Sequence, residues 1–326
     1  MIELTFKQAI KNTLLYELRT NRNSVFVSQD IGVFGGEYKV SKGFDVQIPE
    51  ERIIEVPVSE NAYIGSSVGL SLNGFNVITE VPGCKFLLRS LDPIVNYASK
   101  LPAMGTNIPG SLLIRCPIGY SGYTGIQDNE SIESVLSYFP GIKVLYPSNP
   151  KDAIGMLRSA FWEHEPVIFF ENKNLYDTKG EISETKEEKI PLGKANITRE
   201  GTDITVITYG SMVKEAMKAS DVAYMSNVKV EVIDLRTIKP IDFDTIVKSV
   251  KKTGRVIIMS ESYKSCSVGS EIAATLAEGE AFDYLEAPIV RMCSDDKFLP
   301  FNPQKAKEIL PSSGKLLEKI MQLVEY

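Results

Sequence analysis

A glutamate at the start of a predicted helix is the clearest candidate for chemistry in this sequence. Residues 52–56 (RIIEV) read as a short strand closed by Pro57, and Ser59 stands where a helix N-cap is expected to accept a backbone N–H. Glu60 then lies in the first turn of a predicted helix over 60–72. Open α/β sheets bind ligands at such strand-to-helix connections. A carboxylate here could equally complement the helix dipole, and its position leaves both readings open.

The helix that follows Glu60 is rich in small residues. Gly65 and Gly69 stand four positions apart inside it. Glycine in a helix interior costs roughly 1 kcal/mol relative to alanine, so this pair needs a reason. We expect close approach of another backbone, such as that of a neighbouring helix, at this face.

The size and composition of the chain exclude several classes of protein. Its 326 residues suit two domains, and a net charge of −6 with mixed signs argues against nucleic acid as the main partner. No apolar run approaches the ~20 residues of a membrane span, so no membrane partner is expected. Residues 1–21 lack the pattern of a signal peptide. The four cysteines are far apart, which predicts reduced thiols in a cytoplasmic protein.

Strands and helices alternate along both halves of the chain, which predicts βαβ units and parallel sheets. The charged stretch 176–201 interrupts the pattern and predicts a domain link with an edge hairpin, and 305–326 predicts a final helix. Two glycine-rich stretches, 31–43 and 118–127, are predicted as loops, the first as a turn and the second as a functional surface loop. We therefore expect an α/β protein with two doubly wound domains. Their ranges are 1–185 and 201–326, joined by a linker at 186–200.

Six short motifs occur in order across both halves: 30–40 (DIGVFGGEYKV), Ser59-Glu60, 92–96 (DPIVN), 140–144 (PGIKV), 166–171 (PVIFFE) and 232–237 (VIDLRT). Together they resemble the β subunit of the thiamine-diphosphate-dependent first component of 2-oxo acid dehydrogenase complexes, of the pyruvate dehydrogenase type. The same fold forms the back half of transketolase. The resemblance implies that the first domain binds the pyrimidine of the cofactor and that the smaller second domain is of the transketolase C-terminal type.

The resemblance implies a cofactor, thiamine diphosphate, shared between two chains. An α subunit would hold its diphosphate and Mg²⁺ through a GDG…N motif that this sequence lacks, in an α₂β₂ heterotetramer. Glu60 would hydrogen-bond the ring nitrogen N1′ and favour the tautomer that takes the proton from the thiazolium C2. Phe86 falls where the family places an aromatic residue against the pyrimidine, and plain core is the alternative reading. Ile31 is a further expected cofactor contact.

The chain also departs from the family pattern. A histidine usually lies in the loop before 140–144, within a His-Ser-Gln run, where this chain has Asp128-Asn129-Glu130. Asp128 and Gln127 are assigned to the substrate or acceptor site. Aspartate is normally anionic at neutral pH and cannot donate a proton as imidazolium does, which slightly favours an unusual acceptor. The one histidine, His164, is expected at the surface. Lys85, also assigned to the substrate or acceptor site, suits an anionic substrate or is a solvated rim charge. The family can hold a structural K⁺ on backbone carbonyls, here those of Leu112, Ala160, Phe161, Glu163 and Glu165.

These observations lead to three functional hypotheses. In the first, the chain is the β half of an enzyme that decarboxylates a pyruvate-like 2-oxo acid and passes the acyl unit to lipoyl on an acyltransferase. In the second, it serves a transketolase-like carboligase that transfers a two-carbon unit to a sugar or another carbonyl. In the third, it is a scaffold subunit without catalysis. We expect an enzyme that is active only together with an α subunit.

Overall fold

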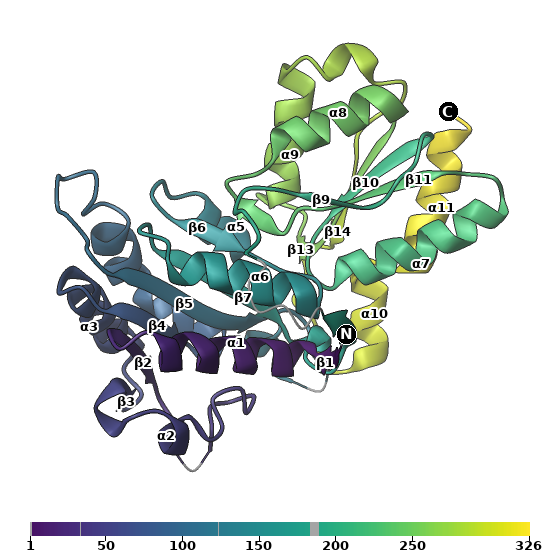
Figure 1. Cartoon of the computed structure of the whole chain (residues 1–326). Helices are drawn as coiled ribbons and strands as arrows, with labels where there is room; N and C mark the ends of the chain where they lie inside the picture. Colours follow the sequence, from purple (N-terminus) through teal and green to yellow (C-terminus); the bar gives the residue numbers. More distant parts are fainter. Residues whose placement is uncertain (1, 33, 123, 183–188) are drawn as a thin grey trace. The chain divides into compact units, whose positions relative to one another are not determined.

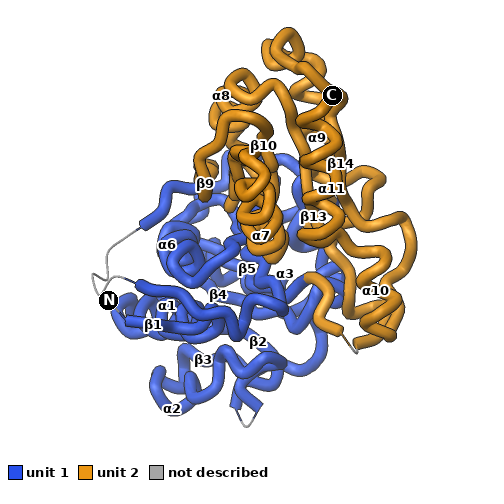
Figure 2. Tube along the Cα trace, turned by 90° about the vertical axis from the view of Figure 1, so that its right-hand side faces the viewer, with its two compact units in different colours: residues 1–118, 135–192 blue, residues 119–134, 193–326 orange. Residues whose placement is uncertain are grey.

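The computed structural model describes residues 2–32, 34–122, 124–182 and 189–326, which form two compact units. Unit 1 comprises residues 1–118 and 135–192, and unit 2 comprises residues 119–134 and 193–326 (Figure 2). The segment 119–134 interrupts the first unit in sequence because its contacts are with the second. The expected domain end at 185 and the first linker residues fall within 183–188, outside the described residues.

Unit 1 is built on a parallel sheet. Its strands lie in the order β6-β7-β5-β4-β2-β3 (Figure 1). Their bounds are Ser24–Ser28 for β2, Ile53–Glu55 for β3, Asn76–Glu80 for β4, Ser111–Ile118 for β5, Lys143–Leu145 for β6 and Val167–Asn172 for β7. The central strands are buried on both faces, as parallel strands between helical layers must be.

Helices cover both faces of this sheet. On one face, α1 (Phe6–Thr20) and α6 (Pro150–Phe161) bury a core that includes Ile78 of β4. The neighbouring Thr79 points the opposite way and donates a 2.7 Å hydrogen bond to Ser67 of α3 (Glu60–Leu72). The predicted doubly wound α/β arrangement is therefore confirmed for unit 1.

The segment after β4 is continuous helical structure of irregular pitch. It runs through α4 (Cys84–Leu87), a 3₁₀ turn (Leu88–Ser90) and a π-helical stretch (Asp92–Ala98). The predicted helix at 91–100 therefore begins about two turns earlier than expected. This geometry carries the side chains at positions 85, 86 and 89 past the start of α3, which the segment contacts.

Unit 2 has a second sheet in the order β14-β13-β10-β11-β9, parallel except for β9. The strands are β9 (Asn196–Arg199), β10 (Ile204–Thr208), β11 (Val230–Asp234), β13 (Val256–Tyr263) and β14 (Val290–Ser294). The helices α7 (Met212–Met225) and α11 (Ser313–Val324) share one apolar core with it. The other face meets α8 (Phe243–Thr253) and α9 (Val268–Glu278). This unit is doubly wound as well.

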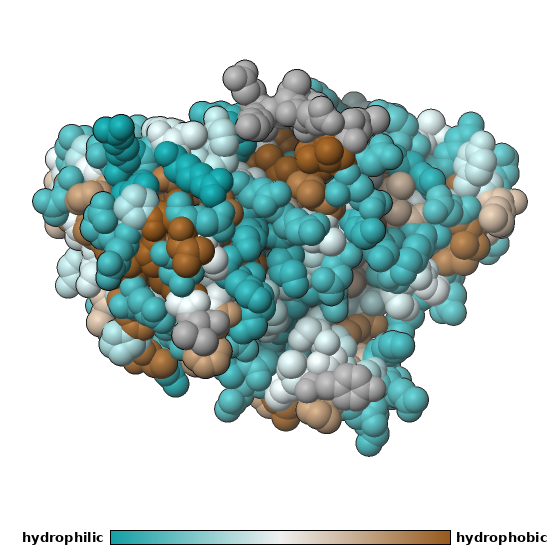
Figure 3. Space-filling view, turned by 60° about the horizontal axis from the view of Figure 1, so that its bottom comes forward, coloured by the Kyte–Doolittle hydropathy of each residue, from teal (hydrophilic) through white to brown (hydrophobic). Residues whose placement is uncertain are grey.

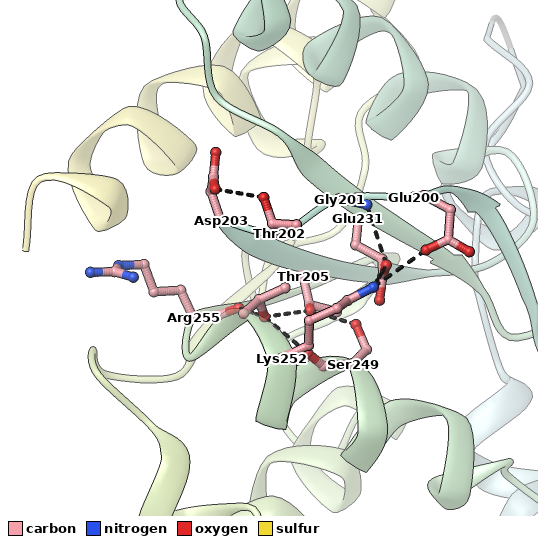
Figure 4. A network of polar contacts seen from close by, with 10 residues as sticks. Glu200, Gly201, Thr202, Asp203, Thr205, Glu231, Ser249, Lys252 and Arg255 are labelled. Carbon is pink, nitrogen blue, oxygen red and sulfur yellow. Dashed lines mark hydrogen bonds and ion pairs between the residues drawn. The ribbon is translucent and has the colours of Figure 1, made fainter.

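A polar network closes the amino-terminal edge of this second sheet (Figure 4). Lys252 of α8 bonds the buried carboxylate of Glu231 on β11 and lies 3.3 Å from Glu200. The Gly201 amide donates to the same Glu231 carboxylate at 3.3 Å. Thr205 of β10 meets Ser249 of α8 at 2.6 Å. The network pairs the buried Glu231 carboxylate with a cation at the edge opposite the carboxyl ends of the strands, so we assign it to stability rather than chemistry.

Three expectations for local structure were wrong. The predicted edge hairpin does not form, because β8 (Lys179–Ile182) pairs with β1 (Ile2–Thr5) while β9 pairs with β11. The final predicted helix is two helices, because α10 (Pro303–Ile309) ends before Pro311. Ser59 is the N-cap residue of α3, but its hydroxyl donates to the carbonyl of Pro57 instead of capping. The remaining short elements are α2 (Phe44–Gln47), α5 (Glu133–Ser137) and β12 (Thr237–Lys239).

Candidate functional site

Glu60 is buried with an unsatisfied oxygen. It is the first residue of α3 and only 3% exposed, and its Oε1 atom has no hydrogen-bond partner among the described residues. Its other oxygen lies 3.7 Å from a guanidinium nitrogen of Arg89. A charge that merely complements a helix dipole would be solvated. A buried carboxylate oxygen without a donor costs about 1–3 kcal/mol, which indicates a site built for a donor from elsewhere.

Two cations surround the ring of Phe86, close to Glu60. The Lys85 Nζ atom lies 4.8 Å from the ring centroid, and the Arg89 guanidinium carbon lies 5.6 Å from it. Phe86 is half-buried, so it is not plain core. Arg89 links the two features, since it reaches both the ring and the Glu60 carboxylate. The surface beside Glu60 therefore combines an aromatic ring with positive charge, and it would attract a flat heterocycle or an anion.

Tyr63 adds a second buried polar group one helical turn after Glu60. Its phenol oxygen has no hydrogen-bond partner among the described residues, and the side chain is 2% exposed. Burial, with a smaller contribution from the charge of Glu60, raises the pKa of the Tyr63 phenol far above its usual range. The phenol therefore remains a proton donor at every physiological pH.

The remaining predicted site residues are placed differently. Ile31 is fully buried in the core of unit 1, so its side chain does not line the surface beside Glu60, and only its backbone is left to meet a ligand. Gln127 and Asp128 belong to a short 3₁₀ turn in segment 119–134 of unit 2, with Gln127 exposed and Asp128 half-buried. His164 is exposed, as expected.

The carbonyls predicted for K⁺ are partly engaged already. The Phe161 carbonyl accepts a 2.7 Å hydrogen bond from the Ser111 hydroxyl, and the Ala160 carbonyl accepts one from the Glu163 amide. The Glu163 carboxylate is 2.7 Å from Lys143. Among the described residues there is no cluster of three or more side chains suited to a metal ion. A backbone K⁺ site at this turn stays a prediction.

A groove of about 460 Å³ runs along α3 and exposes its small residues. Its lining is mostly apolar and includes Tyr63, Ser66, Gly69 and Leu70. A Cβ atom at Gly69 would meet nothing within 4 Å, and one at Gly65 would meet only Pro93 at 3.8 Å. Among the described residues, no backbone atom lies within 4 Å of a Cβ at either glycine outside the helix itself, so the expected close approach is not made within this part of the chain. On the face shown in Figure 3, exposed hydrophobic side chains likewise gather in patches.

A buried ionic cluster includes the last residue of β4, directly before the segment that carries Phe86. Arg115 of β5 is 1% exposed and makes two bonds to Glu171, at 2.7 and 2.9 Å. A third bond of 2.7 Å reaches Glu80, the last residue of β4. Tyr176 donates a further bond to Glu171 at 2.9 Å. Because Glu80 is six positions before Phe86, this cluster fixes the start of the segment 81–89, which carries Phe86.

Family models match both units. The pyrimidine binding domain of transketolase matches residues 3–179, and the transketolase C-terminal domain matches residues 193–316. These matches define the class of protein, one whose two domains are those of transketolase.

Relatives narrow the class further. The chain is 36% identical to the pyruvate dehydrogenase E1 component subunit beta of Staphylococcus epidermidis, over all of both chains. The protein of the same name from Staphylococcus aureus is also 36% identical over the full length of both. This chain belongs to the pyruvate dehydrogenase E1 β-subunit family of the thiamine-diphosphate-dependent transketolase superfamily.

Solved structures agree in fold. A chain described as "Split gene transketolase, inactive beta4 tetramer" superposes with a TM-score of 0.79 at 18% identity, covering 99% of this chain and 98% of that one. A transketolase variant from Pichia stipitis gives 0.71 at 12% identity, covering all of this chain and 46% of that one. At these identities the likeness concerns the fold alone.

Two further features concern the cysteine thiols and the lengths of the helices. None of the four cysteines, all of them in the described part of the chain, forms a disulfide. Burial raises the pKa of the Cys116 thiol well above its usual range, so that thiol is unreactive. Within the described ranges, no helix has the length and apolar character needed to cross a membrane.

Sequence reasoning singled out Glu60 and Phe86 as candidates but did not name three residues that the structure places beside them or at the start of the segment that carries Phe86. Arg89 lies three positions after Phe86, and Tyr63 three after Glu60, so each is one helical turn from a predicted site residue. That spacing was a usable signal. Arg115 had no such signal, because an arginine inside a strand is rarely buried.

Proposed function

We propose that this chain is the β half of a two-chain enzyme that decarboxylates a pyruvate-like 2-oxo acid and passes the acyl unit to lipoyl. Thiamine diphosphate would be shared with an α subunit that holds the diphosphate and Mg²⁺. The observation that carries the proposal is the orphaned Oε1 atom of Glu60, since a buried acceptor without a donor fits a protonated ring nitrogen. Family membership at 36% identity over the full chain supports it.

In this proposal the chain contributes binding and one proton contact. Glu60 accepts a hydrogen bond from the aminopyrimidine ring, and Tyr63 offers a phenol donor from the next turn of α3. Phe86 offers a ring face for stacking, with Lys85 and Arg89 moving from it to meet the carboxylate of the substrate. The cofactor itself would supply the electron sink that the decarboxylation of a 2-oxo acid needs.

The proposal is tested by reconstitution. The purified chain is combined with its α partner, thiamine diphosphate and Mg²⁺, and acylation of a lipoyl domain from pyruvate is followed. Rapid acylation supports the proposal. If 2-oxo acid is consumed but only a sugar or aldehyde acceptor is extended, the carboligase function holds instead. Asp128, in the place of the family histidine, is the observation that favours this second function.

Asp128→His is expected to speed lipoyl acylation if lipoyl is the acceptor. A protonated imidazole can donate a proton to a lipoyl sulfur during acylation, whereas an ionised aspartate cannot. A positioned acid–base group of this kind raises a rate about 100-fold or more. Consumption of pyruvate with a small artificial oxidant should change less than about twofold, because that reaction needs no acceptor proton.

The matched control is Ile126→His, which places the same side chain at an exposed position of the same turn. It should leave both rates unchanged. If Asp128→His slows acylation, Asp128 itself serves the acceptor, and the idea of a lost function at this position fails.

The partner surface is also proposed. We assign the groove along α3 to an interface in an α₂β₂ assembly, because its small residues and apolar lining suit the close approach of a helix from another chain. The cytoplasmic location, the lipoyl-bearing acyltransferase and a structural K⁺ belong to the same proposal.

Gly69→Leu is expected to disrupt that assembly without harming the fold. No atom lies within 4 Å of the new Cβ, and leucine favours a helix by about 1 kcal/mol over glycine. The melting temperature of the isolated chain should therefore hold or rise, while light scattering with the α partner shows smaller species. Gly314→Leu on α11, also without atoms within 4 Å, is the control and should assemble normally. If the Gly69→Leu variant assembles normally, the groove along α3 is not part of the interface.

A further inference from the structure

Segment 119–134, which carries Gln127 and Asp128, is attached to the rest of unit 2 at both of its ends. Between the two attachments it folds on itself. The Gly119 amide donates to the carbonyl of Glu130 at 3.3 Å, which closes the base of the loop. Asn129, 2% exposed, accepts a hydrogen bond from the Thr124 hydroxyl and donates one to the Thr124 carbonyl. The described part of the segment is thus a compact loop with a closed base.

The first attachment is the carboxylate of Glu261 on β13. One oxygen accepts the Tyr120 amide at 3.1 Å, and the other accepts the Ser211 hydroxyl at 2.9 Å. Glu261 is 8% exposed, and the Ser294 hydroxyl of β14 donates to its backbone carbonyl. A single carboxylate therefore ties the start of the segment to the connection that follows β10.

The second attachment is Glu133, the first residue of α5. It is fully buried, and the Tyr209 phenol at the end of β10 donates to it at 2.7 Å. The Ser262 hydroxyl of β13 is a second donor. Tyr209 and the carboxylate of Glu261 are the titratable groups that face Glu133. Both attachments lie at the carboxyl ends of neighbouring parallel strands, the edge at which α/β sheets place their chemistry.

We propose that Glu133 and Glu261 are positioning residues, which clip segment 119–134 onto the ends of β10 and β13 and thereby hold Gln127 and Asp128 in place for the acceptor. The acceptor role rests on the function proposed above, but the clip itself does not. These two carboxyl groups, with their hydroxyl and amide donors, tie the segment to the strands of unit 2, whereas its internal bonds only close the loop on itself.

The clip at Glu133 depends on pH. Burial raises the pKa of Glu133 to about 6, although the Tyr209 and Ser262 donors oppose the shift. An opened segment returns this carboxyl to water and to its ordinary pKa. The closed segment therefore binds the proton more tightly, so closure is most favourable below the ordinary pKa and weakens as pH rises through 6. The equilibrium constant for opening should rise roughly 30-fold between pH 5 and 8.

The test is hydrogen exchange of the full chain in its assembly, resolved to peptides and corrected for intrinsic rates. Tyr209→Phe removes the phenol donor and should raise the exchange of 119–134 about tenfold at pH 7.5, while β10 and β13 remain protected. Glu133→Gln should abolish the pH dependence of opening that the unmodified chain shows. In turnover, Tyr209→Phe should raise KM for the acceptor and leave consumption of the 2-oxo acid with an artificial oxidant unchanged.

Tyr224→Phe, at an exposed tyrosine on α7, is the matched control and should behave like the unmodified chain. If Tyr209→Phe does not fold, Glu261→Ala tests the other attachment, because it removes the carboxylate that accepts the Tyr120 amide, and it should release the Tyr120 end. Unchanged exchange of 119–134, or equal acceleration throughout unit 2, would overturn the clip. Faster exchange confined to the segment, with no effect on acceptor KM, would keep the clip and refute only the acceptor role.

Discussion

Glu60→Gln is expected to reduce turnover of the reconstituted enzyme at least about 100-fold, the lower range for loss of a positioned acid–base group. Glutamine keeps the shape and an acceptor oxygen but cannot share a proton with a ring nitrogen. The stability of the chain should change little. The Oε1 atom has no hydrogen-bond partner within the described ranges, and the contact with the largely exposed Arg89 is worth no more than a surface ion pair. Steady-state rates and urea unfolding measure the two expectations separately.

Glu51→Gln is the matched control, since Glu51 is an exposed carboxylate of the same unit, and it should leave both properties unchanged. A Glu60→Gln enzyme that keeps more than half of the wild-type rate would favour the scaffold hypothesis, in which the fold persists without its chemistry. A large loss of stability would instead identify Glu60 as a structural residue.

Arg115→Met is expected to destabilise the chain by about 3–5 kcal/mol, the usual cost of removing one partner from a buried ion pair. The substitution would leave Glu80 and Glu171 facing each other without their cation. Burial and the neighbouring Glu171 charge already raise the pKa of Glu80, while Arg115 opposes the rise. Without the arginine, the pKa of Glu80 should rise further, and the 81–89 segment should loosen. Urea unfolding measures the loss.

Arg22→Met removes an exposed arginine of the same unit and should cost less than about 0.5 kcal/mol. The double variant Arg115→Met with Glu80→Gln should recover part of the loss, because it also removes one of the stranded charges. A cost below 1 kcal/mol for Arg115→Met would mean that the cluster does not hold the 81–89 segment in place.

Regular patterns made the architecture predictable. Helix 60–72 was placed at its observed bounds, because Pro57 and Ser59 mark its start and apolar residues continue to Leu72. The alternation of apolar strands and amphipathic helices gave both doubly wound units. Glu60 was found because a charge at a strand-to-helix connection stands out in sequence.

What escaped prediction depends on contacts between distant segments. The charged stretch 176–201 resembles a hairpin locally, yet its two strands join different sheets, and local propensity carries no information on partners. The irregular helix at 84–98 brings Arg89 to Glu60. The composition of a segment does not reveal the pitch of the helix that it forms. The attachment of segment 119–134 to unit 2 rests on Glu133 and Glu261, 128 positions apart in sequence (261 − 133).

The most direct measurement is the distance from Glu60 to the bound cofactor in a structure of the assembled enzyme with thiamine diphosphate. The Oε1 atom, for which the described part of the chain supplies no donor, should lie about 2.6–3.2 Å from the aminopyrimidine nitrogen N1′, with Arg89 moved aside. A cofactor bound elsewhere, with Glu60 still directed at Arg89, would contradict the proposed role of this residue and with it the proposed site.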